Sequence, residues 1–283
     1  MHDRNVHTIL GCDNDYDESK IVVFGAPFDG TTSYRPGARF ASAAIRNESY
    51  SIETYSIYQD KDLEDICVFD SGDLELPFGN VPKILDKIEK FVLKLMNDGK
   101  IPLMIGGEHL VTLGAVRGAV KKHKDLHIIH FDAHADLRDE YLGEKLSHAT
   151  VIRRCWDLVG DNRIFQFGIR SGCREEIYWG RKHVETCFFN FANLGSIVEK
   201  LENKPVYLTI DLDVLDPSVF PGTGTPEAGG VSFDELLNAI EQVSKLNIVA
   251  LDITELSPPL DPTGASTVLA YKLLREILLL IYR

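Results

Sequence analysis

Short apolar runs alternate along the whole chain with longer segments in which apolar residues recur at helical spacing. The short runs are typical of buried strands, and the longer periodic segments are typical of amphipathic helices. Strands are predicted at residues 21–27, 66–70, 101–105, 126–132, 163–169, 184–189, 205–211 and 247–254. Helices are predicted near residues 38–50, 80–98, 112–123, 146–158, 173–182, 193–203, 232–245 and 264–282. The repeated order of strand and then helix predicts an α/β fold, with a mostly parallel sheet covered by helices on both faces.

Several predicted helices carry start or stop signals. Asn80 precedes Val81 and Pro82, so a capping side chain and a proline open one helix, and Gly99 closes it. Ser232 stands three residues before Glu235, which is the spacing of a capping box. The sequence contains no internal repeat and no linker that would divide it. One domain over residues 1–283 is therefore predicted, with residues 1–20 as an N-terminal extension.

Potential metal ligands follow three of the predicted strands. His109 follows 101–105 through a glycine-permitted turn, one aspartate-rich cluster follows 126–131, and another follows 206–210. Side chains two residues apart on an extended segment point the same way, and strand ends of a parallel sheet meet at one edge. We therefore expect six side chains to converge: His109, Asp132, His134, Asp136, Asp211 and Asp213.

Crowding four carboxylates needs compensation, because each close pair costs about 4 kcal/mol at an effective dielectric constant of 20. Two divalent cations would balance the four negative charges, so the pattern predicts a two-metal hydrolase site. Oxygen and nitrogen ligands with no cysteine nearby suit manganese. An isolated Asp-x-His is more often a loop or capping feature, but convergence from three strand ends favours the metal site. His127 and His130 lie inside the predicted strand and are interpreted as core residues.

The composition of the chain favours some binding partners and cellular compartments over others. The net charge of −13 and the pI near 5.1 argue against nucleic acid and are compatible with a cationic substrate. The five cysteines have no Cys-x-x-Cys pair, which predicts free thiols in a reducing compartment. The first residues lack a signal-length apolar stretch, and the apolar run 277–281 is too short to span a bilayer. A cytoplasmic protein without a membrane partner is expected.

The motifs together resemble those of the ureohydrolases, the family of arginases and agmatinases. The matching segments are Gly106–His109, Asp132–Asp136 and Asp211–Pro217, and Pro221–Gly230 is similar to the agmatinase branch in particular. The resemblance implies a single-domain, three-layer αβα fold around an eight-stranded parallel sheet, a binuclear manganese centre and a homo-oligomer, either trimer or hexamer. It also implies that His109, Asp132, Asp136 and Asp211 bind one manganese ion. Asp132, His134, Asp211 and Asp213 would bind the other, so that Asp132 and Asp211 bridge.

Four further residues receive roles. Paired metals lower the pKa of a shared water, and the hydroxide so formed is the nucleophile that a guanidinium carbon requires. His148 is similar in position to the family's catalytic histidine, and its pKa class suits a proton shuttle; the alternative is a histidine at a helix N-terminus. Glu255 resembles the glutamate that holds the substrate guanidinium. Thr223 and Glu227 are candidate substrate contacts, although Gly-Thr-Gly is also an ordinary turn.

The part of the substrate far from the guanidinium group distinguishes the activities of this family. The loop over residues 137–146 holds Asp139, Glu140 and Glu144 against Arg138 and Lys145, which suits a second ammonium better than a carboxylate. Hydrolysis of agmatine to putrescine and urea, a step of polyamine biosynthesis, is therefore expected. Aminopropylagmatine ureohydrolase is the nearest alternative, followed by arginase, guanidinobutyrase or formimidoylglutamase. A non-catalytic metal-binding protein on the same fold is a remote alternative.

Overall fold

A single parallel sheet of eight strands organises the computed structural model, which describes residues 7–283. Its strands are β1 (Ile21–Ala26), β4 (Val68–Asp73), β5 (Ile101–Gly106), β6 (His127–Phe131), β7 (Ile164–Ile169), β8 (Glu185–Phe188), β9 (Pro205–Asp211) and β10 (Asn247–Thr254). Their order across the sheet is β4-β1-β5-β10-β9-β6-β7-β8. Each predicted strand is present, and every pairing in this sheet is parallel. The predicted α/β class is confirmed.

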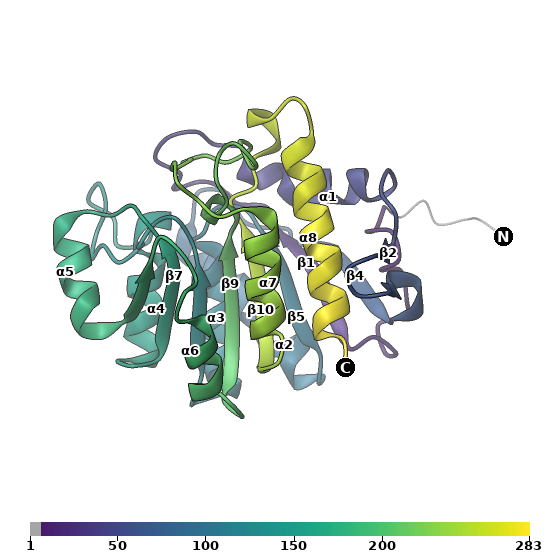
Figure 1. Cartoon of the computed structure of the whole chain (residues 1–283), viewed down its shortest axis with the longest axis horizontal. Coiled ribbons are helices and arrows are strands. Elements are labelled where there is room, and N and C mark those ends of the chain that lie inside the picture. The colour runs from purple at the N-terminus through teal and green to yellow at the C-terminus, as the bar shows by residue number, and fades with distance from the viewer. Residues whose placement is uncertain (1–6) are drawn as a thin grey trace.

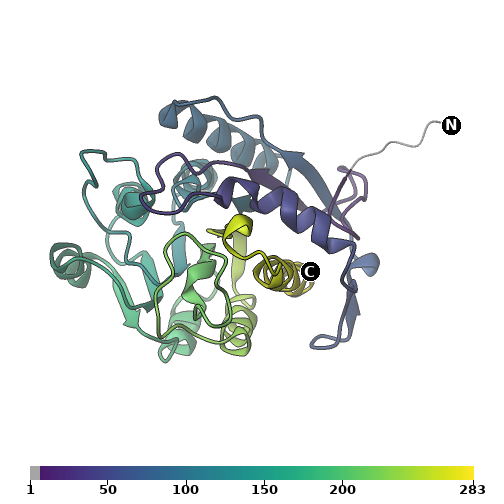
Figure 2. The ribbon, with the colours of Figure 1, turned by 90° about the horizontal axis from the view of Figure 1, so that it is seen from above.

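Helices cover both faces of the sheet and complete three layers (Figures 1 and 2). They are α1 (Ala41–Ser49), α2 (Val81–Asn97), α3 (Val111–Lys122), α4 (Val151–Val159), α5 (Arg174–His183), α6 (Leu194–Lys200), α7 (Phe233–Val243) and α8 (Ala265–Ile281). One buried apolar cluster joins the sheet to α1, α6, α7 and α8, and a second joins it to α2, α3 and α4. On β1, Ile21 and Val23 belong to the first cluster, whereas Val22 and Phe24 belong to the second. A strand buried on both faces explains the continuous apolar runs of the sequence.

The predicted helix signals are confirmed where the structure tests them. The Asn80 side chain accepts a hydrogen bond from the backbone N–H of Lys83 at 3.1 Å, and Gly99 adopts a left-handed φ of 76° just past the end of α2. Ser232 and Glu235 form the reciprocal capping box of α7. The helix predicted from 146 instead begins at Val151, after a 3₁₀ turn over His148–Thr150. The hairpin of β2 (Tyr55–Ser56) and β3 (Lys61–Asp62) was not predicted, because two-residue strands leave no periodicity to detect.

The described part of the predicted N-terminal extension packs against the domain. Ile9 and Cys12 are fully buried in the core, and the backbone N–H of Ile9 donates to Asp70 at 2.9 Å. Residues 1–6 lie outside the described residues. The five cysteines are free thiols. Within residues 7–283, no helix combines the length and the apolar character needed to cross a membrane.

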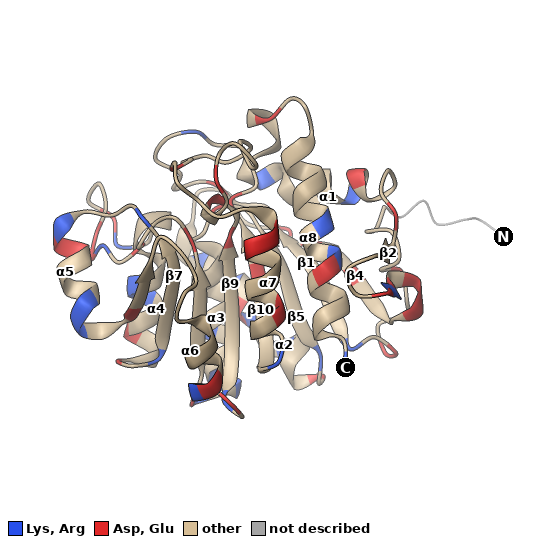
Figure 3. Ribbon diagram, viewed as in Figure 1, with Lys and Arg blue, Asp and Glu red and all other residues tan. Residues whose placement is uncertain are grey.

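Charged residues of both signs are spread over the outer helices and loops, and acidic positions also occur at the upper ends of the central strands (Figure 3). Two of the acidic residues at these strand ends, Asp132 and Asp211, are buried.

Candidate metal centre

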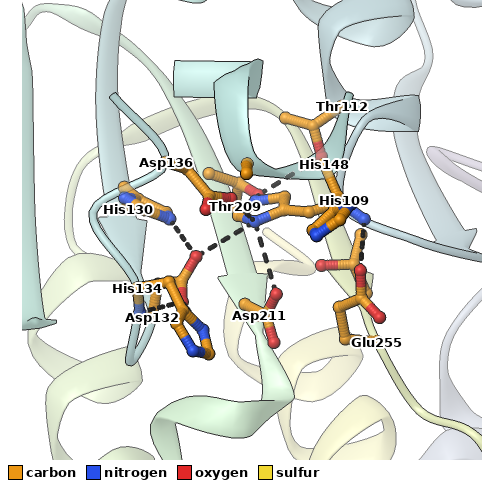
Figure 4. A network of polar contacts seen from close by, with 12 residues as sticks. His109, Thr112, His130, Asp132, His134, Asp136, His148, Thr209, Asp211 and Glu255 are labelled. Atoms are coloured by element: carbon orange, nitrogen blue, oxygen red, sulfur yellow. Dashed lines mark hydrogen bonds and ion pairs between the residues drawn. The ribbon is translucent and has the colours of Figure 1, made fainter. Parts of the chain in front are cut away.

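Four neighbouring strands in the middle of the sheet each place a polar side chain at the carboxyl end. In sheet order these are β5, β10, β9 and β6. His109 follows β5, Glu255 follows β10, Asp211 ends β9, and Asp132 follows β6. Strand ends of an open parallel sheet are where ligands bind. Figure 4 shows five of the six side chains that the sequence singled out at this edge: His109, Asp132, His134, Asp136 and Asp211. The sixth, Asp213, lies beside Asp132 and His134.

His109 faces three carboxylates through one ring nitrogen. Its Nδ1 lies 3.0 Å from Asp132 Oδ2, 3.2 Å from Asp136 Oδ2 and 3.3 Å from Asp211 Oδ2. This nitrogen is buried and makes no hydrogen bond within the described chain. A buried polar atom without a partner is rare in native proteins. A nitrogen lone pair surrounded by three carboxylate oxygens is the donor set of a divalent cation.

A second group forms around His134. Its Nδ1 lies 2.9 Å from Asp213 Oδ2 and 3.6 Å from Asp132 Oδ1. The two oxygens of Asp132 therefore face different histidines, because Oδ2 points to His109 and Oδ1 to His134. Potential ligand atoms of Asp132, His134 and Asp213 all lie within 4.8 Å of one another. A carboxylate shared in this way suits two cations side by side.

The ring of His109 is held from behind. Its Nε2 lies 3.0 Å from the hydroxyl of Thr209, and that hydroxyl donates to Asp252 Oδ1 at 2.6 Å. Because the hydroxyl proton goes to Asp252, the Thr209 oxygen accepts from Nε2–H, which leaves the Nδ1 lone pair facing the carboxylates. Asp252 also accepts from the hydroxyls of Thr112, at 2.9 Å, and Tyr207. Asp252 is therefore a fully buried carboxylate that supports His109 through Thr209.

His130 supports the neighbouring ligand. The predicted burial of His130 is confirmed, and its Nε2 lies 2.8 Å from Asp132 Oδ2. Its Nδ1 accepts from the Gln166 side chain at 3.0 Å, so Nε2 is the protonated nitrogen. Sequence reasoning missed this contact, although the signal was present: His130 stands two residues before Asp132 and so points to the same side of the strand.

Burial and mutual repulsion perturb the carboxylates. Burial, with the charges of Asp213 and Asp132, raises the pKa of Asp211 well above its usual range. Burial and the charge of Asp132 raise the pKa of Asp136 to about 7. Asp132 shows the opposite shift, because the neighbouring histidines outweigh its burial and hold its pKa well below 3.8. The fold therefore collects negative charge that cations would neutralise.

Backbone strain accompanies the same residues. Glu255 has φ 65° and Asp136 has φ 52°, in the left-handed region that side chains other than glycine seldom adopt. Such conformations persist where surrounding contacts determine them, often at functional sites. Glu255 donates its backbone N–H to the carbonyl of Gly107 at 2.9 Å and accepts through Oε1 from the N–H of His109 at 2.8 Å. Burial, and then the charge of Glu108, raises the pKa of Glu255 well above its usual value.

His148 borders the same cleft, at the first position of the 3₁₀ turn that precedes α4. The structure thus places it both at a helix start and in the cleft. Its Nδ1 lies 2.9 Å from the carbonyl oxygen of Thr31, and its Nε2 lies 3.2 Å from Ser33 Oγ. Burial lowers the pKa of His148 below 6.5, so the neutral ring predominates at pH 7.

The cleft has a volume of about 300 Å³. Its lining includes His109, His134, Asp136, His148, Asp211 and Glu255, together with Arg138, Tyr141, Thr225 and Glu176. The three acidic residues of the 137–146 loop that were expected to suit a second ammonium, Asp139, Glu140 and Glu144, are exposed and lie outside this lining. Asp139 instead pairs with Arg154 at 2.8 Å.

Two candidate substrate contacts also lie elsewhere. Thr223 is buried, but its side chain does not line the cleft, which Thr225 does instead. The Glu227 side chain is likewise absent from the lining, and its backbone carbonyl accepts from Arg170 at 2.8 Å.

Arg170 was not recognised from the sequence. It follows β7 and donates to backbone carbonyls of Gly168, Asp213, Val214, Leu215 and Glu227. A planar guanidinium with five N–H donors suits this task. It thereby holds the segment that carries Asp213. No local sequence pattern marks a charged residue whose partners are all backbone groups, so Arg170 could not be predicted.

Comparisons with known proteins agree with this arrangement. A family model described as the arginase family matches residues 19–280. An agmatinase of Bacillus anthracis is 48% identical over 269 residues, covering 93% of this chain and 92% of that protein. An N(1)-aminopropylagmatine ureohydrolase of Thermococcus kodakarensis is 40% identical, covering 85% of this chain and 84% of that protein. The crystal structure of a Clostridium difficile protein described as an agmatinase superposes on this chain with a TM-score of 0.92. The two sequences are 53% identical, and the match covers 95% of this chain and 99% of that one.

Proposed function

The chain belongs to the arginase family, and from that premise we propose that it is a binuclear manganese agmatinase, which hydrolyses agmatine to putrescine and urea. The observation that carries the proposal is the convergence of three carboxylate oxygens, 3.0–3.3 Å away, on the unpartnered Nδ1 of His109. The similarity to an agmatinase over 93% of the chain supports the substrate.

The nitrogen and oxygen atoms gathered at this edge support the following ligands for the two ions. One manganese ion would be held by His109, Asp132, Asp136 and Asp211, and the other by Asp132, His134, Asp211 and Asp213. Asp132 supports a bridging role because its two oxygens face two different histidines. Oxygen and imidazole ligands without thiolate favour manganese over softer metals. When bound, two such ions lower the pKa of a shared water and supply a nucleophile at neutral pH.

The protein's own residues do the remaining work. Glu255, fixed by backbone contacts to Gly107 and His109, is placed to hold the planar guanidinium through parallel hydrogen bonds. His148 is placed to accept a proton from the attacking water and return it to the departing amine, because its neutral form predominates at pH 7. Both side chains line the same cleft as the ligands.

The far ammonium of agmatine requires an anionic partner, and we assign it to Glu176. Outside the ligands and Glu255, Glu176 is the acidic residue that lines the cleft. Its Oε1 accepts from the backbone N–H of Cys173 at 2.5 Å and lies 3.5 Å from Arg138 Nε, and its Oε2 accepts from the backbone N–H of Leu137 at 3.1 Å. An ammonium would therefore share this carboxylate with these donors. This assignment replaces the rim that the sequence suggested for the 137–146 loop. A carboxylate on the substrate would meet Glu176 with like charge, which disfavours arginine.

A specific observation keeps aminopropylagmatine as the second candidate, since an enzyme named for it is 40% identical to this chain. A single-domain chain over residues 1–283, a cytoplasmic location and a trimeric or hexameric assembly belong to the same proposal.

The test is urea release from agmatine, aminopropylagmatine, arginine and guanidinobutyrate by the manganese-loaded protein. Agmatine or its aminopropyl derivative should show a kcat/KM at least about tenfold above arginine. Glu176→Gln should narrow that difference while leaving manganese content unchanged. Equal or better turnover of arginine would overturn the agmatinase assignment, and no urea from any of the four would favour a non-catalytic protein.

A further inference from the structure

Glu108 is a fully buried carboxylate that stands next to His109 but outside the metal cluster. Both oxygens of its carboxylate accept hydrogen bonds from one short loop, the Thr31 loop, through its residues Thr31 and Thr32. Oε2 accepts from the backbone N–H of Thr31 at 2.9 Å and from the Thr32 hydroxyl at 3.0 Å, while Oε1 accepts from the Thr31 hydroxyl. A buried carboxylate is costly unless it is hydrogen-bonded in this way. Its contacts therefore fix the position of the Thr31 loop.

The same loop lies directly against the end of β5. The backbone N–H of Glu108 donates to the carbonyl of Phe28 at 2.7 Å. A Cβ on Gly107 would lie 1.8 Å from that carbonyl oxygen, so only glycine permits the approach. The turn that presents His109 to the metal cluster is thus also the support for the Thr31 loop.

Thr31 contacts His148 on its other side. The carbonyl oxygen of Thr31 lies 2.9 Å from His148 Nδ1, and its hydroxyl oxygen accepts from the backbone N–H of His148 at 3.1 Å. A carbonyl can only accept, so Nδ1 carries the proton and Nε2 carries the lone pair. Nε2 lies beside Ser33, and both residues line the cleft (Figure 4 shows His148 near His109 and Glu255).

We propose that Glu108 and Thr31 are positioning residues, which hold His148 in the tautomer whose Nε2 faces the cleft. This inference rests on the proposed function, because it requires His148 to move the proton between the attacking water and the departing amine. The proton that Nε2 accepts is the one it returns, so the ring ends the cycle as it began. Glu108 thereby connects the metal-binding turn, through Thr31, to the proton-transfer residue His148.

The test is a double-mutant cycle on the full-length, manganese-loaded protein. Thr31→Val keeps the side-chain shape but removes the hydroxyl, and it should lower kcat about tenfold to a hundredfold, since a small misplacement of a reacting group costs that much. KM for agmatine and the amount of bound manganese should stay within about twofold of the parent values. In a His148→Ala background the same substitution should change kcat by less than about twofold. Thr31→Ser should restore the parent rate.

Thr32→Val is the matched control, because it removes a hydroxyl from the same carboxylate without any contact to His148; its kcat should stay within about threefold of the parent. Glu108→Gln, carried through the same cycle, gives an independent answer if Thr31→Val does not fold. A loss of kcat that is equal in the presence and absence of His148, or a loss of manganese, would refute the positioning role. Normal turnover by His148→Ala alone would instead defeat the proposed function.

Discussion

Thr209→Val removes the hydrogen-bond acceptor behind His109 and should weaken manganese binding at one of the two sites. The Thr209 hydroxyl lies 3.0 Å from His109 Nε2 and donates to Asp252 at 2.6 Å, and all three side chains are buried. Valine has nearly the same shape as threonine, so the packing between β9 and its neighbours is retained. The Nε2–H of His109 is then left without a partner and the ring without its orientation.

The magnitude follows from that lost contact. Leaving a buried donor unsatisfied costs about 1–3 kcal/mol, and each 1.4 kcal/mol corresponds to about a tenfold change in an equilibrium constant. A supporting contact of a metal ligand is typically worth about 10- to 100-fold in metal affinity. The two ranges overlap, and we expect the manganese dissociation constant to rise about 10- to 100-fold.

Calorimetric titration of the metal-free protein with manganese measures both sites. His109 is assigned to one ion only, so one dissociation constant should rise and the other should stay near its parent value. Thr112→Val should have a smaller effect, because that hydroxyl reaches Asp252 at 2.9 Å but does not contact His109. Thr254→Val is the control on neighbouring β10, since its hydroxyl makes only a long contact of 3.5 Å with the carbonyl of Ile210. Unchanged affinity in Thr209→Val, or equal weakening of both sites, would refute the reasoning.

Three further outcomes are expected. Asp132→Ala or Asp211→Ala should abolish urea release, because each removes a ligand from both ions; metal analysis showing at most one divalent site in the manganese-loaded parent protein would contradict the binuclear assignment. His148→Ala should lower kcat about 10²- to 10⁴-fold with manganese content intact, and steady-state kinetics with metal analysis would expose a mutant that keeps its turnover or loses its metal. Asp261→Ala should lower the free energy of unfolding at pH 7 by about 0.5–2 kcal/mol: although burial opposes it, hydrogen bonding from Ser266 and Thr263 lowers the pKa of Asp261 to about 2. A carboxyl group whose pKa is lowered on folding stabilises the protein at pH values above its ordinary pKa, and this stabilisation is lost as the pH falls toward 2. Urea denaturation should therefore show a difference in unfolding free energy between parent and variant that is constant above about pH 5 and shrinks below about pH 4.

Strand and ligand positions were predictable because both depend on local patterns. Continuous apolar runs report burial on two faces, and Asp132 and Asp211 stand where such runs end. A parallel sheet places the six ligand candidates at the same edge, and the strand order then brings them together. The sequence could not supply the strand order, which puts β10 between β5 and β9 although it comes last in the chain.

Residues that act through backbone groups were beyond sequence reasoning. Arg170 donates to the carbonyl of Asp213, and the Thr31 hydroxyl accepts from the backbone N–H of His148; backbone partners in distant segments carry no side-chain signature. The acidic 137–146 loop shows the opposite error. Its composition was read correctly, but Asp139 faces Arg154 rather than the cleft, because composition does not reveal which way a loop side chain points.

The position of β10 also sets the order in which the protein can mature. A chain that has reached only residue 246 possesses two separate part-sheets, β4-β1-β5 and β9-β6-β7-β8, each with an open edge where β10 belongs. His109 then sits on one part-sheet, whereas Asp132, His134, Asp136, Asp211 and Asp213 sit on the other, so the proposed ligand set that includes His109 is incomplete. Insertion of β10 closes both edges in one step. The two-metal arrangement is therefore complete only when β10 holds the two part-sheets together, because β10 is the strand that pairs with both β5 and β9.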